Sequence, residues 1–215
     1  MNRLIHVLTV SSLVLFAGCQ DPVARNTGVY MLMDTSGTYS QELEKARQII
    51  NYTLAQLQPE DSFAVARIDT GSFSEKDIVA KATFDDRPST ANGQKRIFAQ
   101  EVANFVDNTV PAPYTDITGG LLQAVEFLNE KETGRKTIFI YSDLKEDLKA
   151  GYVRDIPLEL IGFDVVALNV TKLRSDNIDP REYLSRLAEW QARVEAGGGS
   201  WRVINDLERL DMLLK

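Results

Sequence analysis

The sequence predicts an α/β protein built on a doubly wound, mostly parallel six-stranded sheet, with one antiparallel edge strand and helices on both faces. Short apolar runs alternate with longer segments whose apolar residues recur at helical spacing, which is typical of parallel strands covered on both sides. Residues 69–77 form a polar, non-helical connection between two apolar runs, which indicates an antiparallel pair. The 215 residues show no internal repeat and no second boundary, so we expect one domain.

Each expected element follows from one of two patterns. Apolar runs of strand length lie at residues 29–33, 63–68, 78–84, 137–141, 163–170 and 201–204. Apolar side chains three or four residues apart predict helices at residues 38–57, 90–106, 117–129, 180–195 and 207–214. Pro180 suits the first turn of its helix, and the glycines at 197–199 suit its end.

The first residues resemble a bacterial lipoprotein signal. Arg3 precedes an apolar stretch at residues 4–15 that is short for a bilayer span, and Ala17 and Gly18 lie directly before Cys19. The resemblance implies a signal peptide at residues 1–18, a lipidated tether at 19–27 and a folded domain at 28–215. Cys19 would carry the lipid that anchors the protein in the cell envelope. Gln20 would favour the outer membrane in a Gram-negative host. A simple signal peptide or an uncleaved anchor helix are the alternatives.

Charge and composition exclude several classes of function. The net charge is -7, and removal of residues 1–18 leaves 23 basic and 31 acidic side chains, a net charge of -8. Such a chain is poorly suited to the phosphate backbone of nucleic acid. That removal also takes away the single histidine, His6, while lipid would block Cys19. Histidine-dependent triads, Cys-His pairs and His- or Cys-ligated zinc are therefore excluded.

Oxygen-bearing side chains follow two of the central strands. Asp34, Ser36 and Thr38 come directly after the first strand, Thr115 precedes a helix, and Asp143 follows the strand at 137–141. In doubly wound sheets, ligands bind beyond the carboxyl ends of the strands, where the strand order reverses. Hard cations such as Mg²⁺ prefer oxygen ligands. We therefore expect these five residues to form a divalent-cation site.

Each of these residues also has a purely structural interpretation. Asp34 could form an Asx-turn, Thr38 or Thr115 could cap the following helix, and Asp143 could lie in a solvated loop. It is the coincidence of five donors at one end of the sheet that favours a site. We also expect Asp34 to lie at the rim of the sheet, outside the core.

At these positions the sequence resembles the von Willebrand factor A (VWA) domain family. That family has an Asp-x-Ser-x-Ser motif, matched here by Asp34, Ser36 and Thr38, then a distant threonine, matched by Thr115, and an aspartate, matched by Asp143. The resemblance implies a metal-ion-dependent adhesion site that holds Mg²⁺ or Mn²⁺. The hydroxyls would be the nearest ligands and the carboxylates would often act through water. A protein partner would complete the coordination with an acidic side chain.

The sequence departs from the family pattern at two places. Leu144 stands where the family often has glycine, and Pro113-Tyr114 replaces a common Gly-Gly pair. These departures keep open a metal-free domain that serves only as a scaffold.

Three further acidic residues lie close to the expected site in the sequence. We expect Asp116, Glu146 and Asp147 to be solvated surface residues that add negative charge to the end of the sheet.

An enzyme is the other alternative, and we expect none. The segment from Asp34 to Thr38 superficially matches a phosphatase Asp-x-Asp-x-Thr motif, which would make a magnesium-dependent phosphate-processing enzyme. Ser36 occupies the position of the second aspartate, so the proton-transfer group is missing. No Gly-x-Gly-x-x-Gly motif follows a strand, which argues against dinucleotide binding.

Overall fold

A computed structural model describes residues 26–37, 39–173, 175–206, 210, 213 and 214. The predicted signal peptide with Cys19, the ligand candidate Thr38 and most of the expected last helix lie outside these residues. Among the helices in the described residues, none has the length and apolar character needed to cross a membrane.

The sheet has six strands in the order β3-β2-β1-β4-β5-β6. The strands are β1 (Thr27–Asp34), β2 (Ser62–Ile68), β3 (Ile78–Thr83), β4 (Arg135–Tyr141), β5 (Phe163–Leu168) and β6 (Ser200–Ile204). All neighbouring pairs are parallel except β2 and β3, which are antiparallel. The predicted fold class, with its antiparallel edge strand, is therefore confirmed.

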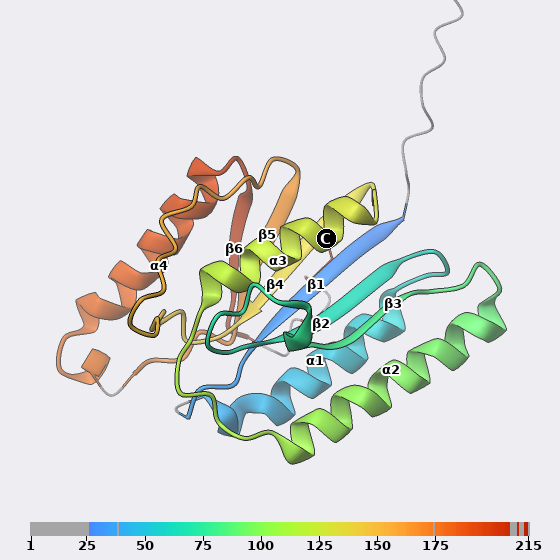
Figure 1. Ribbon diagram of the computed structural model, residues 1–215, viewed down its shortest axis with the longest axis horizontal. Coiled ribbons are helices and arrows are strands. Elements are labelled where there is room, and N and C mark those ends of the chain that lie inside the picture. Colours follow the sequence, from blue (N-terminus) through green and yellow to red (C-terminus); the bar gives the residue numbers. More distant parts are fainter. Residues whose placement is uncertain (1–25, 38, 174, 207–209, 211–212, 215) are drawn as a thin grey trace, which may run out of the picture.

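Four α-helices cover the two faces of the sheet (Figure 1). They are α1 (Leu43–Gln56), α2 (Pro88–Asn108), α3 (Ile117–Glu130) and α4 (Pro180–Ala196), and three short 3₁₀ helices accompany them: η1 (Ser40–Glu42), η2 (Glu75–Asp77) and η3 (Ser175–Asn177). The helix expected at residues 38–57 is thus a 3₁₀ turn followed by α1. The helix expected at 90–106 begins earlier, at Pro88, because proline fits the first helical turn.

Alternation along β1 divides the core into two layers. Val29, Met31 and Met33 pack with α1 and α2, whereas Tyr30 and Leu32 pack with α3 and α4. Every residue of β1 after Thr27 is buried, as expected for a central strand with helices on both faces.

The strand order places a topological switch between β1 and β4. From β1 the chain builds outward through β2 and β3, and it then returns to the other side of β1 to build β4, β5 and β6. The loops after β1 and β4 therefore begin side by side. The chain after β1 continues to β2 on one side of this pair, and the chain after β4 continues to β5 on the other side. Asp34 ends β1 and Asp143 follows β4, so the predicted site lies at this switch point.

Candidate metal site and comparisons with known folds

Three of the predicted ligands line one pocket beyond the carboxyl ends of β1 and β4. Ser36, Thr115 and Asp143 come from three separate loops and face a space of about 310 Å³. The backbone of Ser36 pairs with Ala112, and the backbone of Thr115 pairs with Asp147. These two bridges bring the three loops together.

Asp34 is the last residue of β1, at the rim of the sheet as expected, but it is fully buried. One carboxylate oxygen accepts a 2.8 Å hydrogen bond from the Ser36 amide, and the other accepts a 2.6 Å hydrogen bond from the Ser142 hydroxyl. The first bond is the Asx-turn contact considered above. Burial raises the pKa of Asp34, while the hydrogen bonds from Ser142 and Ser36 act in the opposite direction.

Asp143 is only 3% exposed, which rules out the solvated-loop interpretation. One of its oxygens accepts a 2.9 Å hydrogen bond from the Lys145 amide. Burial raises its pKa to about 6, and the nearby Asp34 charge adds to this rise, whereas Arg186 and Lys145 oppose it. A bound divalent cation would favour the ionised form of such a carboxylate.

Thr115 is buried and does not cap α3; that role belongs to Asp116, whose carboxylate accepts a hydrogen bond from the Gly119 amide. Thr115 lines the pocket, and a threonine hydroxyl is a suitable ligand for a hard cation.

The side chains that line the pocket include oxygen atoms of the kind that bind divalent cations. Hydroxyls from Ser36 and Thr115 and a carboxylate from Asp143 are all hard oxygen ligands. No group of three His, Cys, Asp or Glu side chains suited to a metal occurs in the described residues. Lys145 also lines the pocket and brings a positive charge to it.

Of the three acidic residues expected at the surface, Asp116 is buried, Glu146 is partly buried and Asp147 is exposed. Asp116 is 1% exposed and forms an ion pair of 2.6 Å with Arg154. Its carboxylate also accepts a 3.0 Å hydrogen bond from the Ser72 amide. Asp116 therefore joins the loop after β2, the start of α3 and the segment after β4.

Glu146 is partly exposed, and it binds residues of α3 and α4. Its carboxylate accepts hydrogen bonds from the Thr118 amide at 2.7 Å and from the Thr118 hydroxyl at 3.1 Å, and it lies 3.4 Å from Arg193. Arg154 and Arg193 therefore offset the charges of Asp116 and Glu146. This end of the sheet is less acidic than the sequence suggested.

Ser142 is a functional candidate that the sequence analysis missed. Its hydroxyl donates to Asp34 and accepts a 3.0 Å hydrogen bond from the Leu144 amide. Its position directly before Asp143 was the available signal, but the contact with Asp34 depends on the pairing of β1 with β4.

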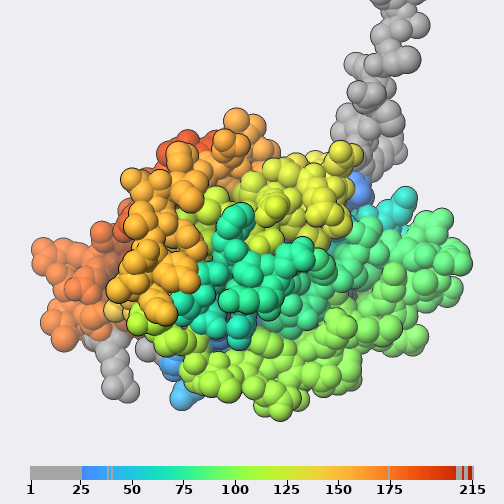
Figure 2. All heavy atoms as spheres, in the orientation of Figure 1, coloured from blue at the N-terminus to red at the C-terminus, as the bar shows by residue number. Residues whose placement is uncertain are grey.

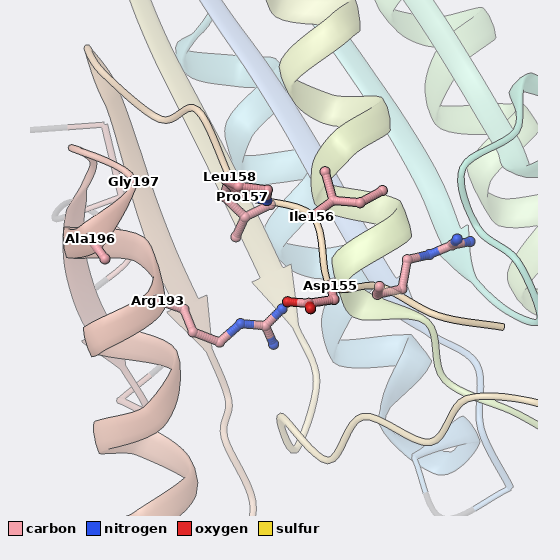
Figure 3. Close-up of a pocket in the computed structure, with 8 residues that line it drawn as sticks. Asp155, Ile156, Pro157, Leu158, Arg193, Ala196 and Gly197 are labelled. Carbon is pink, nitrogen blue, oxygen red and sulfur yellow. The ribbon is translucent and has the colours of Figure 1, made fainter.

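A second pocket, of about 340 Å³, lies between α4 and the segment after β4 (Figure 3). Arg154 and Arg193 belong to its lining, and Arg193 points from α4 toward Asp155 in this view. Both arginines already bind acidic side chains, Asp116 and Glu146. Because their charges are offset within the protein, this pocket gives no sign of an anion site.

Comparison with solved structures identifies the fold. The structure superposes on a von Willebrand factor type A protein from Catenulispora acidiphila with a TM-score of 0.52 and 14% identity, covering 87% of this chain and 40% of that one. The chain has a VWA fold. No protein-family model matches the sequence, and no curated protein matches it either.

Two other solved structures also match this chain. The pilus adhesin SpaC from Lactobacillus rhamnosus GG, in an open conformation, matches with a TM-score of 0.54 and 10% identity over 89% of this chain and 29% of that one. Proximal thread matrix protein 1 from the mussel byssus matches with a TM-score of 0.50 and 10% identity, over 89% of this chain and 45% of that one. This chain therefore spans less than half the length of each of the three matched structures.

Proposed function

We propose that this protein is a lipid-anchored VWA module that binds a protein partner through a divalent cation, Mg²⁺ or Mn²⁺. The observation that supports this most strongly is the meeting of Ser36, Thr115 and Asp143 around one pocket, with the buried Asp34 carboxylate hydrogen-bonded to the Ser36 amide. These residues match the family motif in type and order, and three separate loops supply them.

The roles of the residues follow from their positions. The hydroxyls of Ser36 and Thr115 would bind the cation directly, with Thr38 as a third hydroxyl expected from the sequence. Asp143 would contribute its charge directly or through water. Asp34 would act through water, since both of its oxygens already accept hydrogen bonds from Ser36 and Ser142. When bound, the cation would supply a positive centre for a ligand oxygen.

The partner would offer an aspartate or glutamate. A cation held largely by neutral hydroxyls keeps most of its charge, so an acidic side chain from another protein can complete its coordination. The likeness to a protein named as a pilus adhesin supports protein binding over catalysis in this proposal. We accordingly propose a binding module, without enzymatic activity.

The proposed location is the cell envelope, with a lipid on Cys19 and, in a Gram-negative host, the outer membrane. Each buried methylene of an acyl chain contributes ~0.8 kcal/mol to membrane attachment. Cys19→Ser should release the protein from the membrane fraction or block its maturation. Unchanged fractionation and maturation of this variant would refute the lipid anchor.

A metal-free scaffold is the second candidate, and one observation favours it. Lys145 lines the pocket beside Asp143 and Asp147, so its ammonium group could offset their charge without a metal. In that case the domain would bind its partner by another surface.

Metal titration separates these two candidates. The full chain in detergent should bind Mg²⁺ or Mn²⁺ in a calorimeter, and Thr115→Ala should weaken binding about tenfold or more, as expected for the loss of a direct ligand. Thr90→Ala, at a partly exposed threonine in the first turn of α2, is the control and should bind as wild type does.

A capture experiment tests the partner. Protein retained by the wild-type chain in Mg²⁺ should be released by chelator and should not be retained by Thr115→Ala. If wild type shows no metal binding, the scaffold is favoured. If a partner is retained equally well in excess chelator, recognition uses a surface other than the pocket.

A further inference from the structure

Helix α4 holds the loop after β4 by two backbone carbonyls. The indole N–H of Trp190 donates a 2.9 Å hydrogen bond to the carbonyl of Leu144, and Nε of Arg186 donates a 3.3 Å hydrogen bond to the carbonyl of Asp143. Arg186 and Trp190 are four positions apart and so lie on one face of the helix. They bind two consecutive residues, one of which is a predicted metal ligand.

Arg193, one turn further along the same face, makes a third connection. Its guanidinium donates a 2.6 Å hydrogen bond to the Thr118 hydroxyl and lies 3.4 Å from the Glu146 carboxylate. Thr118 belongs to the first turn of α3, three residues after Thr115. The stripe Arg186–Trp190–Arg193 therefore contacts the loop after β4 and the first turn of α3, which follows the Thr115 loop.

Arg186 is itself fixed from a different element. Its two terminal nitrogens donate hydrogen bonds of 2.8 and 2.7 Å to the two oxygens of Asp176, which lies in η3 and is buried. These bonds hold the pKa of Asp176 below its ordinary value. A guanidinium held in this bidentate geometry has little freedom. It can therefore set the position of the Asp143 carbonyl instead of following it.

Leu144 shows why the loop needs to be held. Its φ is 64°, in the left-handed region that disfavours residues with a side chain. Three contacts maintain it: the amide donates to Ser142, the carbonyl accepts from Trp190, and the side chain is buried in the core between the sheet, α3 and α4. Leu144 lies between Asp143 and Lys145. The Lys145 amide donates a hydrogen bond to the Asp143 carboxylate.

We infer that α4 sets the geometry of the metal-site loop, with Trp190 and Arg186 as positioning residues for Asp143. The positioning itself is a property of the metal-free protein. Its consequence for metal affinity rests on the function proposed above. The inference also explains how leucine can occupy a left-handed position next to a ligand: contacts from α4 and Ser142 offset its conformational cost.

Amide hydrogen exchange of the full metal-free chain tests the positioning. Trp190→Phe removes one N–H and retains most of the packing. The amides of Leu144 and Lys145 should then exchange about fivefold faster, as expected for the loss of one hydrogen bond, while those of β4 and β5 should not change. Gln191→Ala, on the exposed side of α4, is the control. Arg186→Lys, which keeps the charge but loses the bidentate geometry, should affect the same two amides.

A different exchange pattern would overturn the inference. Uniformly faster exchange through β4 and β5 would show that Trp190 only packs the core, and exchange at Leu144 and Lys145 equal to that of the control would show that α4 does not hold the loop. Either result stands whether or not the protein binds metal.

Metal titrations then test the consequence. Trp190→Phe should weaken Mg²⁺ or Mn²⁺ binding severalfold. In the wild type, Mg²⁺ should shift the indole N–H resonance of Trp190, while that of Trp201, the other tryptophan of the chain, stays in place. If wild type binds no metal, the proposed function fails while the exchange result still decides the role of α4. If wild type and Trp190→Phe bind metal equally well, the coupling of α4 to the site is refuted.

Discussion

The Ser142 hydroxyl donates a 2.6 Å hydrogen bond to the buried carboxylate of Asp34, across 108 positions of the chain. This bond links the last residue of β1 to the residue after β4, which directly precedes the pocket-lining Asp143. Ser142 thereby connects the two loops whose residues are expected to share a cation.

Ser142→Ala should destabilise the protein by about 1–3 kcal/mol, because it removes one hydrogen bond from the buried Asp34 carboxylate and another from the Leu144 amide. Urea denaturation measures this change. Ser200→Ala is the control, since the hydrogen bond from Ser200 to Asp164 lies at the surface and should contribute less than about 1 kcal/mol. Equal losses of stability in the two variants would show that the Asp34–Ser142 hydrogen bond contributes no more than a hydrogen bond at the surface.

Asp143→Asn should stabilise the metal-free protein at neutral pH. Burial raises the pKa of Asp143 to about 6, so the folded state binds this proton more tightly than the unfolded state does. The resulting stabilisation is complete below the ordinary pKa of an aspartate and is lost as pH rises through about 6. The free energy of unfolding of the variant should exceed that of wild type by about 1–3 kcal/mol at pH 7, and this difference should shrink toward pH 4. Urea denaturation in chelator across this range tests the prediction, and a gap that is independent of pH would contradict it.

Lys145→Ala should tighten binding of Mg²⁺ or Mn²⁺ by about two- to fivefold, because it removes a positive charge from the lining of the pocket. Calorimetry at low and high salt is the measurement, and the effect should decline as salt screens the charge. Lys149→Ala removes an equal charge from an exposed site four residues away and should change affinity much less. If the two variants behave alike, the effect is only one of net charge.

Arg154→Ala should cost about 2–4 kcal/mol in the free energy of unfolding, because the buried Asp116 carboxylate then loses its ion-pair partner. Arg154 is 16% exposed and Asp116 is 1% exposed. Arg87→Ala is the contrast: Arg87 pairs with Asp85 but is 70% exposed, so its loss should cost less than about 1 kcal/mol. Thermal or urea denaturation compares them, and similar losses would mean that the Asp116–Arg154 pair is not structurally important.

The fold class could be predicted from the sequence, because it depends on the pattern of apolar residues within each strand and helix. The apolar run of β1 and the spacing of apolar residues in α3 report directly on which faces are buried. The antiparallel β3 followed from a short, polar connection. Three site residues, Ser36, Thr115 and Asp143, were also predicted to meet. Ser36 and Asp143 follow parallel strands whose carboxyl ends share one edge, and the resemblance to the VWA motif added Thr115. The roles of Thr38 and Cys19 stay predictions.

Only the tertiary structure decided how the charges and the loops are arranged. Nothing in the local sequence distinguishes Asp116, which is buried with Arg154 38 residues away, from an acidic residue in solvent. Nor could it show that Trp190, on α4, binds the carbonyl of Leu144. Hydrophobic periodicity determines which face of an element is buried, but the partner of a polar group depends on which distant segments pack against it. In this protein those partners are set by the pairing of β1 with β4 and by the docking of α4.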